Sequence, residues 1–184
     1  MKLWLLWVLA SSAGFGLGGR LGRVLSPTED LIVVGCVALS LSLVLAGLLQ
    51  WLTLRPMIAA SGWWLPASIL GVAFFGVLVY GMGRLNRDVG WVLGVIVGWA
   101  LLGVLQWLVL RNQVPGAGWW VAAHAAALVI AGPGVGFVTW LTGAPVDTVV
   151  GNLLRWLSFG AVYGIVTGSA LWWLLRDRLP LATS

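Results

Sequence analysis

Charge is what this sequence has least of. Only 8% of its 184 residues are charged, while 61% are hydrophobic, against about 25% charged residues in ordinary soluble domains. Together with a mean hydropathy of +1.04, this composition excludes a soluble globular protein and indicates an integral membrane protein. A spanning helix takes roughly 20 apolar residues, so the length leaves no room for a separate soluble domain.

Residues that carry chemistry are also scarce. The single cysteine, Cys36, excludes an intramolecular disulfide, and the single histidine, His124, excludes a haem held by two histidines of one chain. No pair of carboxylates falls within an apolar run, and no hydrolase or metalloprotease motif occurs. We therefore expect the protein not to be an enzyme. Nor do we expect a nucleic-acid partner, because the basic residues stand at the ends of apolar runs and form no cluster.

Six apolar runs follow one another with short connections. Each is long enough to cross the hydrocarbon core as a helix, the element that satisfies its own backbone in lipid. The predicted fold class is therefore all-α: a polytopic membrane helical bundle of six transmembrane helices, forming a single domain over residues 1–184. Small residues recur every four positions in most runs, which predicts close helix packing. The runs cover residues 3–25, 31–54, 62–83, 89–110, 118–142 and 149–175.

The start of the chain raises a second interpretation. Lys2 and the short apolar stretch after it imitate a secretory signal peptide. However, Trp7 and Gly14 align with Trp64 and Gly71 in the third run. Because a cleaved leader would have no reason to share the pattern of an internal helix, we predict that the first run is retained as a span. Capping or acidic residues at 26–30, 86–88 and 145–147 mark the starts of the second, fourth and sixth helices.

One motif organises the chain. Gly47–Trp64 reads GLLQWLTLRPMIAASGWW, and Gly103–Trp120 reads GVLQWLVLRNQVPGAGWW; a partial copy, GSALWWLLR, stands at Gly168–Arg176. Pairing consecutive runs predicts three tandem helical hairpin repeats, of which the third diverges, with Leu171 in place of the glutamine. The predicted units cover about 1–58, 59–115 and 116–184.

The QW-L-LR turn followed by GWW, repeated at this spacing, resembles a set of uncharacterised bacterial multi-spanning membrane proteins. In that set, segments like QWLVLR…GWW alternate with Gly/Ala-rich helices. The resemblance covers most of the chain and departs in the third unit. It implies no activity and therefore no functional residues.

Tryptophan predicts how the helices sit in the membrane. Ten of the 14 tryptophans fall on the side that the N-terminus, the two repeated turns and the C-terminus share, which predicts an interfacial belt. Lys and Arg divide evenly between the two sides, but four of the five acids fall on the other side. This weakly favours cytoplasmic termini, in a bacterial inner (cytoplasmic) membrane. The ten are Trp4, Trp7, Trp51, Trp63, Trp64, Trp107, Trp119, Trp120, Trp172 and Trp173.

Polar residues of the repeated turn are the first candidate site. Gln50 and Gln106 lie one turn inside the predicted membrane edge. We expect them either to hydrogen-bond a ligand headgroup or each other, or to satisfy a neighbouring helix or water. Arg55 and Arg111 stand at helix ends, where each pairs with lipid phosphate and complements the helix dipole. All four are candidate ligand or lipid contacts.

The other candidates lie in the third unit. His124 is predicted either to ligate a chlorophyll-type pigment or haem or to bond a neighbouring helix. Gly132, Pro133 and Gly134 predict either a helix break that binds substrate or a proline kink repaired by neighbours. Arg155 lies two turns into the sixth run, from which it snorkels to the membrane surface or contacts a ligand.

The sequence thus predicts a non-catalytic integral membrane protein without a cofactor. Its leading function is that of a structural or accessory subunit that packs against lipid and against a membrane-protein partner or itself as a homo-oligomer. Two alternatives remain open. One is a small transporter or lipid-handling protein that uses the break at Gly132–Gly134, and the other is a pigment- or haem-binding subunit that uses His124.

Overall fold

A computed structural model describes residues 2–26, 30–86, 89–145 and 147–176. These residues form six α-helices and one 3-10 helix, and none of them forms a strand. The helix boundaries lie within a few residues of the predicted ones. The elements are α1 (Lys2–Leu25), α2 (Leu31–Leu54), η1 (Ala59–Trp63), α3 (Trp64–Leu85), α4 (Gly90–Leu110), α5 (Trp119–Thr142) and α6 (Val149–Leu175).

Five helices, α2 to α6, are long and apolar enough to cross a membrane. Their length and composition indicate an integral membrane protein. Helix α1 is as long as α2 at 24 residues but is not among these five. Its glycines and Arg20 dilute its apolar character. That α1 also crosses the membrane therefore stays a prediction.

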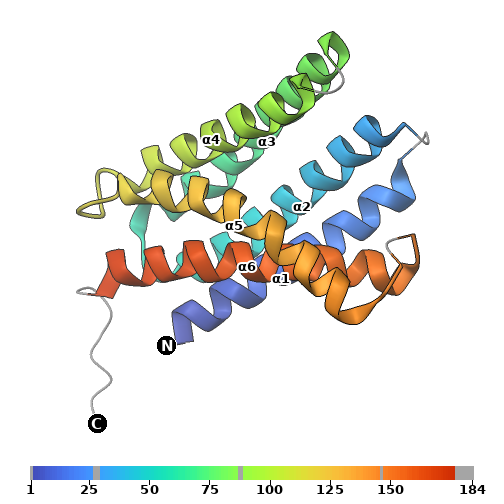
Figure 1. Cartoon of the computed structure of the whole chain (residues 1–184). Coiled ribbons are helices and arrows are strands. Elements are labelled where there is room, and N and C mark those ends of the chain that lie inside the picture. Colours follow the sequence, from blue (N-terminus) through green and yellow to red (C-terminus); the bar gives the residue numbers. More distant parts are fainter. Residues whose placement is uncertain (1, 27–29, 87–88, 146, 177–184) are drawn as a thin grey trace.

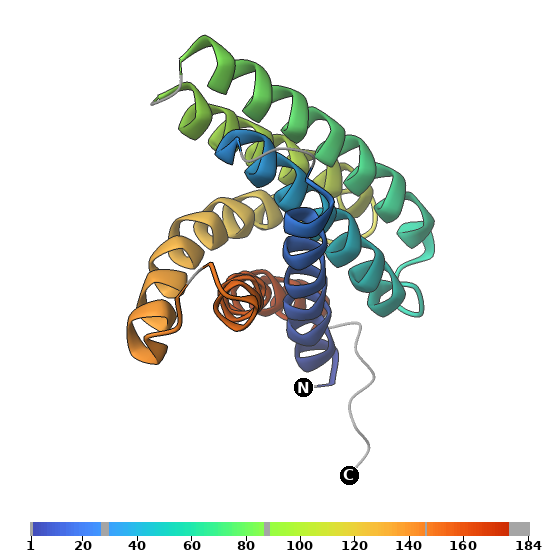
Figure 2. The same ribbon diagram turned by 90° about the vertical axis from the view of Figure 1, so that its right-hand side faces the viewer.

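The helices form a closed ring. Each helix packs against the next one along the chain, and α6 packs against α1. Figures 1 and 2 show α3 and α4 running together as one pair and α1 lying between α2 and α6. The contact between α4 and α5 is the sparsest in the ring. The first and last helices, α1 and α6, lie in close contact with each other.

Glycine allows α1 to approach its two neighbours closely. A Cβ atom added to Gly14, Gly18 or Gly22 would collide with the backbone of α2. On another side of the same helix, Ser11 packs against Gly160 and Gly164 of α6. The small-residue pattern therefore acts where it was predicted to act, by bringing backbones together where lipid supplies little hydrophobic drive.

Side-chain caps begin α2 and α6, whereas the N-cap of α4, Val89, has no side-chain cap and only a bond to Asn86 just ahead of the helix. Residues 27–29, 87, 88 and 146 of the predicted cap segments lie outside the described residues. Asp30 accepts a hydrogen bond of 2.9 Å from the Ile32 amide at the start of α2. Asn86 accepts one of 3.0 Å from Val89 just before α4. At α6 the cap is Thr148, which accepts a 3.0 Å bond from Gly151. Residues 145–147 precede this cap, so the prediction for α6 was displaced by one residue.

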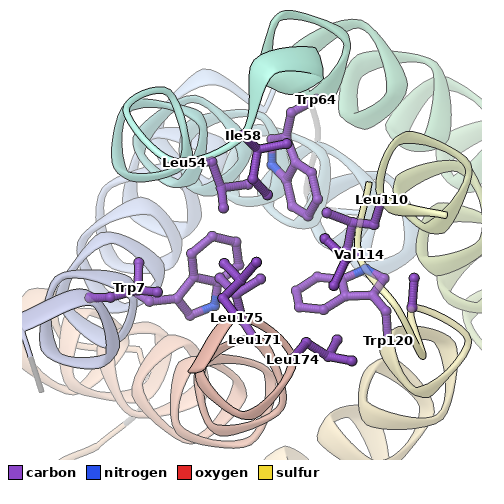
Figure 3. Packing of buried hydrophobic residues seen from close by; sticks show 12 residues of the cluster. Trp7, Leu54, Ile58, Trp64, Leu110, Val114, Trp120, Leu171, Leu174 and Leu175 are labelled. Atoms are coloured by element: carbon purple, nitrogen blue, oxygen red, sulfur yellow. The ribbon is translucent and has the colours of Figure 1, made fainter. Parts of the chain in front are cut away.

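Two buried clusters fill the ring. One lies at the end that carries the repeated turns, and its centre is shown in Figure 3, where Trp7, Trp64 and Trp120 face one another from α1, α3 and α5. Their ring centroids are 5.8, 5.8 and 5.5 Å apart, and each pair is edge-to-face. The other cluster lies deeper and includes Phe15 and Trp99.

The belt prediction is wrong for these three tryptophans. Trp7, Trp64 and Trp120 are each 0% exposed, so they hold the interior of the ring together and do not anchor it in lipid. Their indole rings can serve either purpose, because indole is mostly apolar with one polar N–H group. Trp63 and Trp119, by contrast, are 70% and 63% exposed and fit the predicted belt.

Candidate functional site

Gln50 and Gln106 point into the ring. They are 1% and 2% exposed, and each amide nitrogen donates a 3.0 Å hydrogen bond to a serine of a neighbouring helix, Gln50 to Ser11 and Gln106 to Ser68. Both glutamines are therefore used inside the protein. This geometry favours the second of the two interpretations given to them, in which each satisfies a neighbouring helix.

The buried tryptophans join the same polar layer. Trp120 donates from Nε1 to Oε1 of Gln106 at 3.3 Å, and Trp7 donates to the Thr167 hydroxyl at 3.0 Å. The indole N–H of Trp64 is buried without a hydrogen-bond partner in the described part of the chain. The three tryptophans of the Trp7–Trp64–Trp120 triad therefore pack alike, but their indole N–H groups differ in hydrogen-bond partner.

His124 stands one helical turn beyond Trp120 and is completely buried. Its Nε2 lies 3.2 Å from the hydroxyl of Tyr163, and its backbone carbonyl accepts a 3.2 Å bond from Trp99. The centroids of Trp99, Trp120 and Tyr163 lie 5.4 to 6.0 Å from that of the imidazole. The histidine is thus enclosed by aromatic rings on several sides.

This enclosure bears on the pigment and haem alternative. Gly103 of α4 lies so close that a Cβ atom there would be 3.0 Å from Cβ of His124. A tetrapyrrole ligated by Nε2 would have to displace Tyr163 and the neighbouring tryptophans. Nδ1 is the one imidazole nitrogen that no group in the described segments bonds, and it too is buried. The residues present therefore do not fit a large planar cofactor.

Two pairs of buried polar side chains link neighbouring helices in the deeper layer. Gln50 of α2 donates to Ser11 of α1, and the Tyr163 hydroxyl of α6 lies 3.2 Å from Nε2 of His124 of α5. Each pair therefore ties two adjacent helices of the ring. None of the four residues is an acid, an arginine or a lysine. Chemically, the arrangement satisfies buried polar groups. A polar group left without a hydrogen bond in an apolar interior would cost free energy of folding.

No break occurs at Gly132, Pro133 and Gly134. Helix α5 runs from Trp119 to Thr142 with Pro133 inside it, and Figures 1 and 2 show it as one curved helix. The proline removes one backbone hydrogen bond without ending the helix. Of the two alternatives predicted for this stretch, the helix break is not observed, because α5 continues through Pro133. That neighbouring groups repair the hydrogen bond lost at the proline stays a prediction.

The arginines lie outside the ring. Arg55 and Arg111 are exposed, and their guanidinium carbons stand 5.9 and 5.8 Å from the ring centroids of Trp51 and Trp107, one turn earlier. Arg155 is also exposed, near the opposite end of α6. It shares no layer with the buried glutamines. The predicted site residues therefore fall into separate buried and surface groups.

The turns that carry these arginines begin with the same pattern of backbone hydrogen bonds. In the first, Arg55, Met57, Ile58 and Ser61 donate their amides to carbonyls three or four residues back, at 2.8 to 3.1 Å. In the second, Arg111, Gln113, Val114 and Ala117 do so in the same order, at 2.8 to 3.2 Å. Two segments 56 positions apart in the sequence thus share these four hydrogen bonds. They differ further on, because the first continues into η1 (Ala59–Trp63) whereas the second has Gly116 at a φ of 71°.

Three residues of the buried layer were not predicted from the sequence as partners: Ser11 and Ser68, which bond the glutamines, and Tyr163, which meets His124. A signal for the serines does exist. Ser11 and Ser68 each follow a triad tryptophan by four residues, and His124 follows Trp120 at the same interval. That spacing places each polar side chain directly beneath its tryptophan on the helix face.

Among the described residues, no three His, Cys, Asp or Glu side chains come together in a way that could hold a metal ion. No family model, no curated protein and no solved structure matches this chain. The resemblance to bacterial multi-spanning proteins with QWLVLR…GWW units thus stays a prediction.

Proposed function

We propose that the protein is a non-catalytic structural or accessory subunit of a membrane assembly, and that it binds a further transmembrane helix along the outer face of α5. One observation carries this proposal. Gly132 and Gly136 stand four residues apart on α5, and a Cβ atom added to either would meet nothing within 4 Å. Such a pair of small residues at this spacing is the surface on which membrane helices pack closely.

Other paired glycines of the chain contrast with this face. Gly14 and Gly18 of α1 are covered by the α2 backbone, and Gly160 and Gly164 of α6 are covered by α1. On α5, Val129 and Trp140 continue the exposed stripe at 72% and 77% exposure. The stripe on α5 is therefore built like the covered ones, and no described helix of this chain covers it.

Three tandem hairpins are part of the same proposal, with units of about 1–58, 59–115 and 116–184. The matching hydrogen bonds of the two turns support it. So does the meeting of Trp7, Trp64 and Trp120, which the alignment of the units pairs with one another. Under this proposal the third hairpin is the specialised one, since it carries the uncovered stripe and the His124–Tyr163 pair in place of a glutamine–serine pair.

The two alternatives have less support. Transport through a broken helix needs backbone groups released near Pro133, and α5 is continuous there. Pigment or haem binding needs space beside His124, and aromatic rings occupy it. Residence in a bacterial inner membrane with both termini in the cytoplasm is likewise proposed, on the distribution of the acidic residues.

Photocrosslinking in cells tests the proposed face. A photoreactive amino acid at Val129 is compared with one at Val77 of α3, since these positions are 72% and 70% exposed. We expect a protein adduct from Val129, with Gly132→Leu and Gly136→Leu abolishing it, and only lipid adducts from Val77. Mass spectrometry then tells a second copy of the chain from another protein. Equal adduct yields at the two positions, or a yield insensitive to both leucines, would refute the proposal.

Gly81→Leu serves as the matched control for the leucine variants. Gly81 lies on α3, and a Cβ atom there also meets nothing within 4 Å. The adduct at Val129 should survive this change. If Gly81→Leu removes it as well, the leucines act by disturbing insertion or folding, and the α5 face is not an interface.

A further inference from the structure

We propose that the two repeated turns are a pair of binding sites for anionic phospholipids. In each, an arginine stacked on a tryptophan holds the headgroup phosphate, and an exposed leucine on the same helix end contacts an acyl chain. The residues are Trp51, Leu52 and Arg55 in the first site, and Trp107, Leu108 and Arg111 in the second.

The arginine is held in place in both sites. Its guanidinium carbon lies 5.9 Å from the Trp51 ring centroid in one and 5.8 Å from that of Trp107 in the other, within the range of cation–π attraction. The backbone amide of each arginine also donates to the carbonyl of the same tryptophan, at 2.9 and 2.8 Å. Because the stacked group loses little freedom on binding, it is suited to the planar, two-pronged recognition of phosphate.

Each turn lacks a counter-charge of its own. The segments 55–63 and 111–118 contain no aspartate or glutamate, although each holds an arginine that is exposed. The arginine follows the last residue of a helix, where the carbonyl ends of the dipole favour a cation and leave its guanidinium edge available for an anion. We therefore expect an anion from outside the turn to neutralise the positive charge of the arginine.

The surroundings select a lipid over a soluble anion. Leu52 and Leu108, three residues before the arginines, are 48% and 40% exposed on helices long and apolar enough to span the membrane. Trp63 and Trp119, eight residues after the arginines, are 70% and 63% exposed, and exposed indole prefers the headgroup level. Each site therefore places an exposed leucine next to an arginine at headgroup depth. A phospholipid can contact both side chains, whereas a free phosphate can contact only the arginine.

The third helix end departs from this pattern. The guanidinium of Arg176 stands 5.4 Å from the Trp173 ring, three residues earlier, whereas the other two arginines stack on a tryptophan four residues earlier. In the sequence, no copy of the segment after Arg55 and Arg111 follows Arg176. The proposal therefore assigns two sites and not three.

The test is lipid exchange in nanodiscs of phosphatidylcholine that contain a small fraction of phosphatidylglycerol, with bound lipid counted by native mass spectrometry. Wild-type protein should retain two phosphatidylglycerol molecules preferentially. Arg55→Gln and Arg111→Gln should each remove one, weakening retention about fivefold per site, the factor for one basic side chain near an anionic surface. Inorganic phosphate added alone at millimolar concentration should not compete.

Two matched variants keep the result decisive. Arg84→Gln combined with Arg155→Gln removes two exposed arginines at the other end of the ring and should leave retention unchanged. Arg55→Lys combined with Arg111→Lys keeps the charge but removes the planar guanidinium that binds phosphate through two N–H groups, and should lose most of the preference. The proposal is overturned if the first pair lowers retention equally, if the lysine pair matches wild type, or if phosphate alone displaces the lipid.

Discussion

Replacing Gln106 with leucine tests whether the buried polar layer stabilises the ring. Gln106 is 2% exposed, donates to Ser68 at 3.0 Å and accepts from Trp120 at 3.3 Å. Leucine has a similar volume and occupies the corresponding place at Leu171, where it is fully buried. The change therefore removes two hydrogen bonds while opening little cavity.

The magnitude follows from these two bonds. Hydrogen bonds between membrane helices contribute about 0.6 kcal/mol on average and about 1.7 at most, so losing both costs about 1.2 kcal/mol. The indole N–H of Trp120 is then left buried and unpaired, which adds part of a penalty of about 1–3 kcal/mol. We expect Gln106→Leu to lower the free energy of unfolding by about 1–3 kcal/mol.

Unfolding in mixed micelles, followed by tryptophan fluorescence, measures this change. Trp120→Phe keeps an aromatic ring but removes the N–H group, and Ser68→Ala removes the other partner. In a double-mutant cycle, each should reduce the cost of Gln106→Leu by about 0.6 kcal/mol or more. An unchanged or increased stability of Gln106→Leu, or a cost that neither partner variant reduces, would show that these bonds contribute nothing to the ring.

Two further predictions compare matched positions. Gly18→Ala should destabilise the protein by about 1–3 kcal/mol, because its Cβ atom would collide with the Ser42 backbone; Gly132→Ala, which meets nothing within 4 Å, should be neutral or stabilising by up to about 1 kcal/mol in the monomer. Equal effects on the thermal midpoint would contradict the observed packing. Trp64→Leu should lower the free energy of unfolding by about 1–3 kcal/mol, because two aromatic pairs are lost. Trp63→Leu, at a position 70% exposed, should change it little. A larger effect of Trp63→Leu than of Trp64→Leu would contradict the burial of Trp64.

Helix positions could be predicted because they depend on local properties. Each apolar run had to be helical to satisfy its own backbone, and turn residues such as Pro56 and Gly116 interrupt the runs between helices. Predicted and observed boundaries agree within a few residues, with α2 and α6 identical at both ends. The recurrence of small residues every four positions also predicted where two helix backbones approach each other, as Gly14 and Gly18 do with α2.

The candidate site could be predicted only in part. The sequence singled out Gln50, Gln106 and His124 as polar residues in apolar surroundings, and all three are buried. Their partners come from other helices, as with Tyr163, which lies 39 positions from His124. Such pairings depend on which helices become neighbours, and hydropathy contains no information on that.

Composition and periodicity sufficed to predict a set of membrane-length helices joined by short turns, because both properties act within each segment. The closure of the ring through α6 and α1 and the continuity of α5 through Pro133 became known from the three-dimensional arrangement. So did the choice of the tryptophans that face inward. Trp63 and Trp64 are neighbouring residues of the same type, yet Trp63 is 70% exposed and Trp64 is 0% exposed. An indole ring is suited to either environment, so the packing of distant helices determines which of the two is buried.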